Sequence, residues 1–185
     1  MKKYKLVKWS QDLDLEAFYN NAKLRGFENN SNQQSLVDCF SKEEHAQVWI
    51  LYDNDRAIGS VAAHSLDIMP GAYRICARTC VLTDQTHLSH LRSLNKTIKQ
   101  HQNITAQYFI PACIEWAGRD KKLYISTNES SVGSQHAVHK VYCPALESTG
   151  VLSKDYVLQY RGHEQTFWRL NVEEFYKQLE QFGKW

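Results

Sequence analysis

A basic stretch near the middle of the chain has residue types that could bind phosphate groups. The sequence has no acidic residue between Asp84 and Glu115, and the cations of this stretch are Arg92, Lys96 and Lys99. Arginine and lysine are the side chains that bind phosphates, so a cofactor phosphate and a nucleic-acid backbone are both chemically suitable ligands. A solvated helix face that binds nothing is a third interpretation, since most charged stripes are of that kind.

A second candidate for ligand binding lies where a short strand ends. Ser126, Thr127 and Asn128 close the strand predicted over residues 123–126. Open α/β sheets commonly bind ligands at the carboxyl ends of their strands. The pattern is therefore typical of a binding site, although a plain polar loop has the same composition.

A metal site is not predicted. His136, His139 and Cys143 are spaced at i, i+3 and i+7, near one side of the predicted helix. Imidazole and thiolate are zinc ligands, but no fourth ligand is signalled nearby, so we interpret the spacing as coincidence. The sequence also lacks the C-x-x-C pair, the G-x-S-x-G turn of serine hydrolases and the phosphate loop G-x-x-x-x-G-K.

The composition indicates a packed protein of the cytoplasm. The chain has 185 residues, 43% of them hydrophobic, and carries a formal net charge of +2. Its five cysteines are an odd number without a repeating spacing, which favours free thiols in a reducing compartment. No apolar stretch is long enough for a membrane span, so we expect no membrane association.

Hydrophobic periodicity and turn residues predict the elements that would position these side chains. The predicted strands cover residues 4–9, 45–52, 57–64, 73–82, 123–126, 156–160 and 166–170. The predicted helices cover residues 13–24, 35–40, 88–98, 106–116, 131–147 and 172–182. This order predicts an α/β (α+β) fold with a mixed, mostly antiparallel central sheet and helices on both faces.

Capping residues and prolines sharpen the helix predictions. Thr105 is expected to cap the helix over 106–116, which Pro111 should kink or divide. Pro144 should bend or restart the helix over 131–147, and Val141 is expected on its inner face. Asn171 should cap the last helix, because an asparagine side chain accepts a bond from the first turn.

Three segments follow the order of a known fold family. They are the hairpin WILYDNDRAIGSVAAH, the strand YRICARTCVLTD, and the run from YISTNES through HKVY to Gly150-Val151. In this order they resemble the GCN5-related N-acetyltransferase superfamily. The resemblance implies the acyl-CoA N-acyltransferase fold over one domain, with acetyl-CoA or another acyl-CoA as co-substrate.

The resemblance also implies a donor site, although its most informative motif is missing here. The residues that would bind the acyl-CoA are Cys80, Val81, Leu82, Thr83, His87, Leu88, Ser89, His90, Arg92 and Asn128. The family brings glycine backbone close to the pyrophosphate, whereas the matching stretch from Asp84 to His90 contains no glycine. The chain is thus identified as a divergent member, with a helical insertion expected around residues 85–118.

Acyl transfer needs one group that removes a proton from the amine and one that protonates the leaving thiolate. The resemblance gives the second role to Tyr142, which would otherwise be an ordinary core aromatic. His64 at the end of a strand, or Glu115 acting through a water, could serve as the base. Neither spacing compels that role, so a structural or surface role stays open for both.

The leading prediction is an acyl-CoA-dependent N-acyltransferase acting on a small-molecule or peptide amine. A non-catalytic binding protein on the same frame is the first alternative, which the missing glycines favour. A nucleic-acid accessory using the basic helix 88–101, with Tyr108, Phe109 and Trp116 for stacking, is the second; the near-neutral charge counts against it. An autoinducer-synthase-like enzyme is also open, and Trp9 or Trp185 could mark a homodimer interface.

Overall fold

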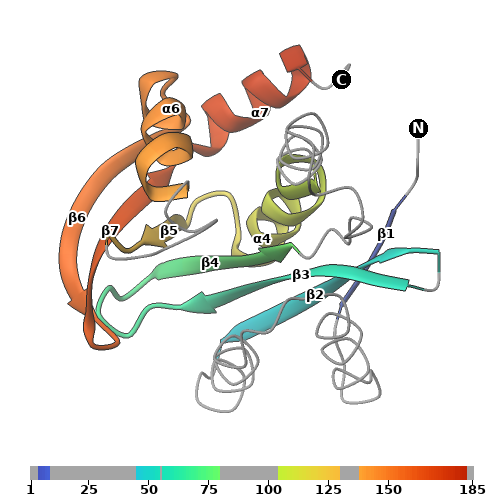
Figure 1. Ribbon diagram of the computed structural model, residues 1–185, viewed down its shortest axis with the longest axis horizontal. Helices are drawn as coiled ribbons and strands as arrows, with labels where there is room; N and C mark the ends of the chain where they lie inside the picture. Colours follow the sequence, from blue (N-terminus) through green and yellow to red (C-terminus); the bar gives the residue numbers. More distant parts are fainter. Residues whose placement is uncertain (1–3, 9–44, 55, 80–103, 130–137, 183–185) are drawn as a thin grey trace, which may run out of the picture. The chain divides into compact units, whose positions relative to one another are not determined.

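The computed structural model describes residues 4–8, 45–54, 56–79, 104–129 and 138–182 (Figure 1). Its strands form a seven-stranded sheet in the order β1-β2-β3-β4-β5-β7-β6. Because β4 and β5 pair in parallel while β1–β2, β2–β3, β5–β7 and β6–β7 are antiparallel, the predicted mixed, mostly antiparallel sheet is confirmed. The chain divides into two compact units, one of residues 1–64 and 76–116 and the other of residues 65–75 and 117–185. The helices predicted over 13–24, 35–40 and 88–98 lie outside the described residues.

The first unit contains an antiparallel meander whose strands were all predicted. The strands are β1 (Lys5–Lys8), β2 (Ala46–Asp53) and β3 (Arg56–Ser65). The centre of β2 is buried from Val48 to Leu51, and Trp49 pairs with Val61. Asn54 follows β2 with φ of 56°, a conformation that asparagine tolerates, which explains why the predicted turn falls here.

The helical segment of the first unit changes type just before its proline. A π-helical turn, η2 (Thr105–Phe109), leads directly into α4 (Ile110–Ala117). The helix type thus changes next to Pro111, where a kink or a division was predicted, since proline cannot donate the backbone bond that an unbroken helix needs. The predicted Thr105 cap is wrong, because Ile104 already has helical φ and ψ and no side chain caps this end.

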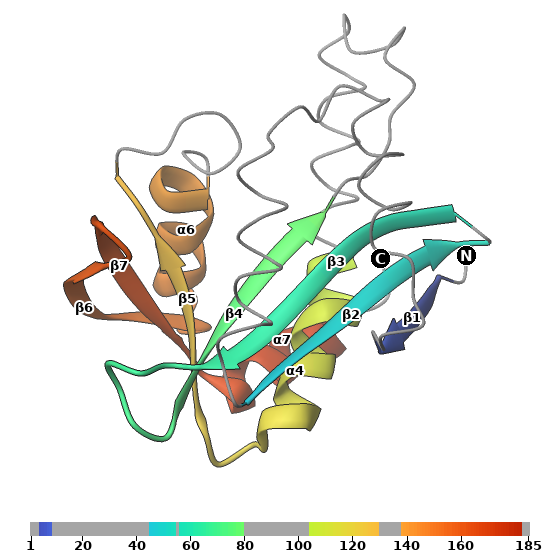
Figure 2. The ribbon, with the colours of Figure 1, turned by 90° about the horizontal axis from the view of Figure 1, so that it is seen from below.

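The second unit contains the start of β4 and the β5-β7-β6 end of the sheet (Figure 2). The strands are β4 (Ala72–Thr79), β5 (Lys122–Thr127), β7 (His163–Leu170) and β6 (Leu152–Tyr160). The β6–β7 hairpin was predicted with a longer connection. Its turn is only Arg161-Gly162, with φ of 52° and 78°, because two residues with positive φ match the twist of the flanking strands.

A β-bulge interrupts β6 near its start. Lys154 pairs with Trp168 and Tyr156 with Phe167, so Asp155 is an extra residue in the ladder. Its carboxylate accepts hydrogen bonds from the Tyr124 hydroxyl (3.1 Å) and the Ser153 hydroxyl (3.1 Å). It also pairs with Arg169 at 3.3 Å. Burial, followed by the bond to Asp155, raises the pKa of Tyr124 to about 12.

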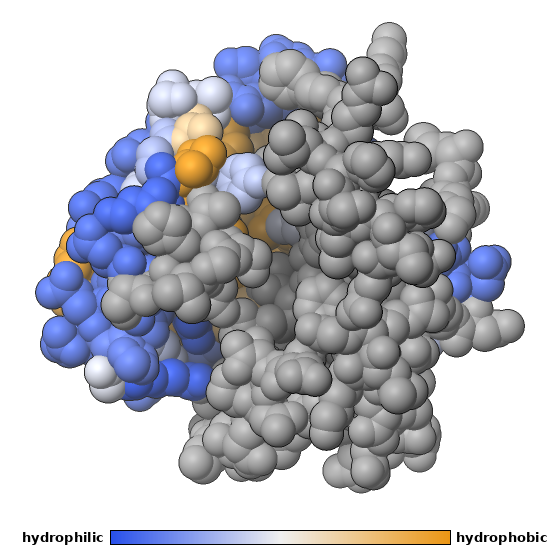
Figure 3. Space-filling model, viewed as in Figure 1, coloured by the Kyte–Doolittle hydropathy of each residue, from blue (hydrophilic) through white to orange (hydrophobic). Residues whose placement is uncertain are grey.

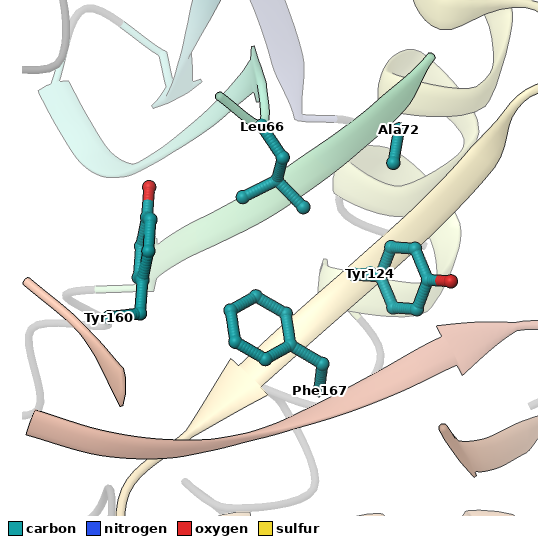
Figure 4. Packing of buried hydrophobic residues seen from close by; sticks show 5 residues of the cluster. All are labelled: Leu66, Ala72, Tyr124, Tyr160 and Phe167. Atoms are coloured by element: carbon teal, nitrogen blue, oxygen red, sulfur yellow. The ribbon is translucent and has the colours of Figure 1, made fainter. Parts of the chain in front are cut away.

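An aromatic cluster forms part of the core of the second unit. Its members are Leu66, Ala72, Tyr124, Tyr160 and Phe167, with Met69 packed against them. Figure 4 shows the Phe167 ring between those of Tyr124 and Tyr160. The edge-to-face arrangements are 6.2 Å from Tyr124 and 5.7 Å from Tyr160, measured between ring centroids. Such pairs add to the stabilisation that area burial alone gives.

Three helical segments complete the second unit. They are η3 (Val138–Tyr142), α6 (Cys143–Ser148) and α7 (Val172–Phe182). Pro144 lies in the first turn of α6, so the predicted restart at this proline is confirmed. Asn171 accepts a bond from the Glu174 backbone N–H at 3.1 Å, which confirms the predicted cap. The prediction for Val141 is wrong: it is 57% exposed, because the wider π-helical turn of η3 changes which residues share a face.

The end of α6 supplies a test of backbone conformation. Gly150 has φ of +79°, and the backbone bonds Gly150 N to Glu147 O and Val151 N to Leu146 O form a Schellman motif. We expect Gly150→Ala to lower the free energy of unfolding by about 1–2 kcal/mol, because an L side chain is strained there. Gly150→Asn should cost less, and urea denaturation compares the two. Equal stability of Gly150→Ala and the parent would contradict this reading.

On the face shown in Figure 3, the coloured surface of the described residues is mostly hydrophilic, with a few hydrophobic areas. The exposed large hydrophobic side chains of the described residues are Ile68, Val141, Leu146, Tyr156, Val157 and Leu158. Trp9 and Trp185, predicted as interface markers, lie outside the described residues. No helix in the described part of the chain is long and apolar enough to cross a membrane.

Candidate functional site

The end of β5 has a free strand edge. The parallel ladder with β4 ends at the pair Ile75–Ile125, while β5 continues to Thr127. In the described part of the chain, Ser126 and Thr127 pair only with β7, through Phe167 and Thr166. Their backbone groups on the opposite edge are therefore not used by the ladder, which fits the predicted position for a ligand at the carboxyl end of this strand.

A buried hydroxyl joins this strand end to η3. Thr127 Oγ1 accepts a hydrogen bond from the Trp168 indole N–H at 2.7 Å. The same oxygen lies 2.7 Å from His139 Nδ1. The His139 ring also meets Trp168 edge-on, with centroids 6.5 Å apart. Thr127 and Trp168 are almost fully buried, so they hold the imidazole at the end of β5.

The Thr127 hydroxyl has two nitrogen partners in this network. An indole nitrogen can only donate, so Thr127 Oγ1 accepts from Trp168 and still has its own proton. His139 Nδ1 is the second partner of that hydroxyl. The hydroxyl donates to Nδ1 in one neutral tautomer of the imidazole and accepts from Nδ1–H in the other, so the contact is a hydrogen bond in either.

Tyr142 ends η3, three positions after His139, and is half-buried. In the described structure its hydroxyl makes no hydrogen bond, so the oxygen is available to a ligand. The next residue, Cys143, is buried, and desolvation followed by the charge of Glu147 raises the pKa of its thiol to about 12. Cys143 is therefore a protonated thiol of the core, which makes it a poor nucleophile.

The two candidate bases differ in their surroundings within the first unit. His64 is fully buried, and its Nε2 lies 3.8 Å from Cys76 Sγ in the neighbouring strand. This burial favours the structural role that the sequence left open for His64. Glu115 is exposed on α4. Its role as a base that acts through a water stays a prediction.

Most predicted cofactor residues lie outside the described residues. They are Cys80, Val81, Leu82, Thr83, His87, Leu88, Ser89, His90 and Arg92. Asn128 is described, and it directly follows β5 in a half-buried position. His136, one of the weighed zinc ligands, is also outside, and the described residues contain no group of three metal-binding side chains. The stacking role proposed for Phe109 is wrong, because its ring is fully buried.

The residues that sequence analysis missed are the hydrogen-bonding partners around Thr127. His139 was weighed only as a zinc ligand, and Trp168 only as part of a strand. Their meeting depends on the β5–β7 register, in which Ile125 is opposite Trp168. No spacing in the sequence signals this register, although the polar strand end at Thr127 did mark the place.

Removing the Thr127 hydroxyl tests the network. We expect Thr127→Val to lower the free energy of unfolding by about 1–3 kcal/mol, because the buried Trp168 N–H and His139 Nδ1 lose their shared partner. Thr166→Val is the matched control, since Thr166 is buried at the paired position of β7 but forms none of these side-chain bonds. Chemical denaturation should separate the two variants; equal losses would show that the network adds nothing.

The sheet order, the parallel β4–β5 pair and the closing β6–β7 hairpin together define the acyl-CoA N-acyltransferase fold. The chain has the fold of the GCN5-related N-acetyltransferase superfamily, so the resemblance seen in the sequence is confirmed at the level of fold. No protein-family model and no curated protein matches the sequence itself.

Solved structures with a similar fold can be compared with this chain. The ribosomal-protein-S18-alanine N-acetyltransferase from Escherichia coli is similar over 91% of this chain and 93% of its own, with a TM-score of 0.53 and 10% identity. An uncharacterized protein from Bacillus halodurans covers 96% of this chain and 90% of its own, with a TM-score of 0.54 and 8% identity. An N-acyl amino acid synthase from uncultured soil microbes covers 97% and 98%, with a TM-score of 0.50 and 10% identity. At these identities the likeness establishes the fold.

Proposed function

We propose that the chain is an acyl-CoA-dependent N-acyltransferase that acts on the amine of a small molecule or peptide. The observation that carries this proposal is the free edge of β5 at Ser126 and Thr127, where the ladder with β4 has ended. A pantetheine arm presents amide groups that can pair with strand backbone as another strand would. Acetyl-CoA, or another acyl-CoA, is the co-substrate that this edge would bind.

The reaction has a simple balance of bonds and protons. The amine nitrogen attacks the thioester carbonyl carbon, an N–C bond forms and the C–S bond breaks. The nitrogen loses one proton and the departing sulfur gains one. Two protein groups are therefore needed, and their contribution to the rate depends on their position near the reacting atoms.

Residues of η3 are candidates for these proton transfers. Tyr142 has a hydroxyl with no partner within the described structure, and we assign it as the proton donor to the thiolate. His139, three positions earlier, is held at the end of β5 by its contact with Thr127. Glu115, acting through a water, is the proposed base; His64 is less suited because it is fully buried.

The fold comparison supports this proposal without naming a substrate. Two of the similar structures are of enzymes that acylate an amine, a ribosomal-protein-S18-alanine N-acetyltransferase and an N-acyl amino acid synthase. The first alternative, a non-catalytic binding protein, would use the same free edge of β5 to bind its ligand but would catalyse no acyl transfer. The nucleic-acid alternative depends on the basic helix 88–101, which lies outside the described residues.

Titration calorimetry with acetyl-CoA tests the proposal. We expect saturable binding with a micromolar Kd that weakens at high salt, because phosphate contacts are screened. Release of free thiol in the presence of an amine panel then separates a transferase from a binding protein. The absence of binding heat and of a thermal shift at millimolar acetyl-CoA would contradict the proposed site for the acyl donor. Binding without turnover for any amine would favour the non-catalytic alternative.

A further inference from the structure

One arginine of the second unit is held in place by neutral groups alone. Arg74, in β4, donates from Nε to Ser126 Oγ at 2.6 Å. Ser126 in turn donates to Gln165 Oε1 at 2.6 Å, and Gln165 Nε2 donates to the Tyr160 backbone oxygen at 3.3 Å. Each hydroxyl and amide thus has a fixed direction, because the arginine can only donate. The chain of bonds leaves the end of the guanidinium, Nη1 and Nη2, out of the network.

The rest of the Arg74 surroundings is aromatic. Its guanidinium carbon lies 5.4 Å from the centre of the Tyr160 ring. Tyr160 and Gln165 are buried, and Arg74 itself is half-buried. In the part of the chain that the structure describes, no carboxylate pairs with Arg74 and nothing bonds Nη1 or Nη2. An anion at Nη1 and Nη2 would give this half-buried cation the counter-ion that the described residues do not supply.

The geometry of an arginine fork selects the ligand. Nε is held by Ser126 and the guanidinium lies over the Tyr160 ring, so both contacts restrict the directions of the two Nη groups before any ligand binds. A planar guanidinium of this kind matches the two oxygens of a carboxylate, which accept two parallel hydrogen bonds. Ser126 also contributes its backbone to the free edge of β5. A molecule bound at Arg74 would therefore lie beside the edge that we assign to the acyl donor.

We propose that Arg74 binds the carboxylate of the acyl acceptor, so that the acceptor class is an amine that also carries a carboxylate, such as a free amino acid. Arg74 is the specificity-determining residue, and Ser126 and Gln165 are positioning residues that act through it. The acylation of such a molecule rests on the proposed function. Its binding at Arg74 does not, and the experiment measures the two separately.

Matched pairs of amines that differ only in the carboxylate test the proposal. The probes are L-phenylalanine with 2-phenylethylamine, L-leucine with isopentylamine, and L-lysine with 1,5-diaminopentane. Ligand-observed NMR titration of the full chain, with and without coenzyme A, measures binding. We expect at least one carboxylated probe to bind about 10- to 100-fold more tightly than its partner, as for a hydrogen-bonded charge pair. Equal affinities within every pair, or no binding of any carboxylated probe at about 10 mM, a concentration that detects even a millimolar Kd, would overturn the proposal.

Variants show whether Arg74 is responsible. Arg74→Met should abolish the difference within each pair, and Arg74→Lys should restore part of it, because lysine keeps the charge without the fork. Ser126→Ala should reduce the difference to a smaller extent. Arg161→Met is the matched control: its guanidinium also lies over Tyr160, at 5.2 Å, but it belongs to the β6–β7 turn. Loss of discrimination in Arg161→Met as well as in Arg74→Met would assign the effect to net charge and overturn the proposal.

The assays keep this inference distinct from the proposed function. If the carboxylated probes bind more tightly but no thiol is released from acetyl-CoA, the Arg74 site is supported and the transferase function is contradicted. If thiol is released with equal kcat/KM for both members of each pair, the transferase function is supported and the Arg74 site is contradicted. Thermal unfolding of each variant identifies one that has failed to fold, and Arg74→Lys and Ser126→Ala then carry the test in place of Arg74→Met.

Discussion

Replacing Phe167 with alanine is expected to lower the free energy of unfolding by about 3–5 kcal/mol. Phe167 is completely buried and meets both Tyr124 and Tyr160 edge-to-face. Its removal leaves a cavity that the strands cannot close, because β7 is paired on both sides, with β5 and with β6. Urea denaturation of the purified variant measures the loss.

Tyr156→Ala is the control for this prediction. Tyr156 is opposite Phe167 in the β6–β7 ladder but is 45% exposed, so its truncation removes far less packing. We expect a loss of about 1 kcal/mol or less, in line with surface substitutions. A similar loss in both variants would mean that the aromatic cluster is not the stabilising core of the second unit.

Replacing Tyr142 with phenylalanine is expected to slow acyl transfer by about 100-fold or more. The change removes one hydroxyl and keeps the ring, so packing at the end of η3 is retained while the proposed proton donor is lost. A positioned acid or base typically contributes between about 10²- and 10⁴-fold to a rate. The loss should appear in kcat, with acetyl-CoA binding unchanged, since an interaction made only in the transition state does not affect the ground state.

The matched control for Tyr142→Phe is Tyr176→Phe. Tyr176 is a half-buried tyrosine of α7 whose ring lies against Arg119, at 4.8 Å from the guanidinium carbon. It has no proposed role in transfer, and its variant should retain the parent rate. Stopped-assay thiol release with the best acceptor of the panel gives both rates. A loss of less than about threefold in Tyr142→Phe, well below the range for a general acid, would exclude it as the proton donor.

The sequence predicted elements best where local chemistry decides the backbone. Asn171 begins α7 because its side chain accepts a first-turn N–H, and Pro144 restarts a helix because it lacks the donor that an interior position needs. Asn54 marks the β2–β3 turn because it tolerates positive φ. Each of these outcomes depends on the residue itself and its immediate neighbours, so reading along the chain was sufficient.

The predictions were weaker where residues distant in the sequence decide the outcome. The Thr127–His139–Trp168 network depends on which residue of β7 is opposite β5, and a shift of one position would turn Trp168 to the other face. The Arg74–Ser126–Gln165 chain likewise needs three strands in register. The exposure of Val141 depends on a π-helical turn, which hydrophobic periodicity does not reveal. The family resemblance identified the fold but not these side-chain partners.

The bulge in β6 allows the chain to change its length at one point. Because Asp155 is the extra residue of the ladder, its deletion would leave Lys154 opposite Trp168 and Tyr156 opposite Phe167. Every residue from Tyr156 onward would keep its face, whereas a deletion elsewhere in β6 would turn part of the strand over. The shortened strand would lose the Asp155 carboxylate, which forms hydrogen bonds with Tyr124 and Ser153 and an ion pair with Arg169. Natural relatives that lack this residue should therefore retain the hairpin and replace the carboxylate, or the three groups that it binds, at other positions.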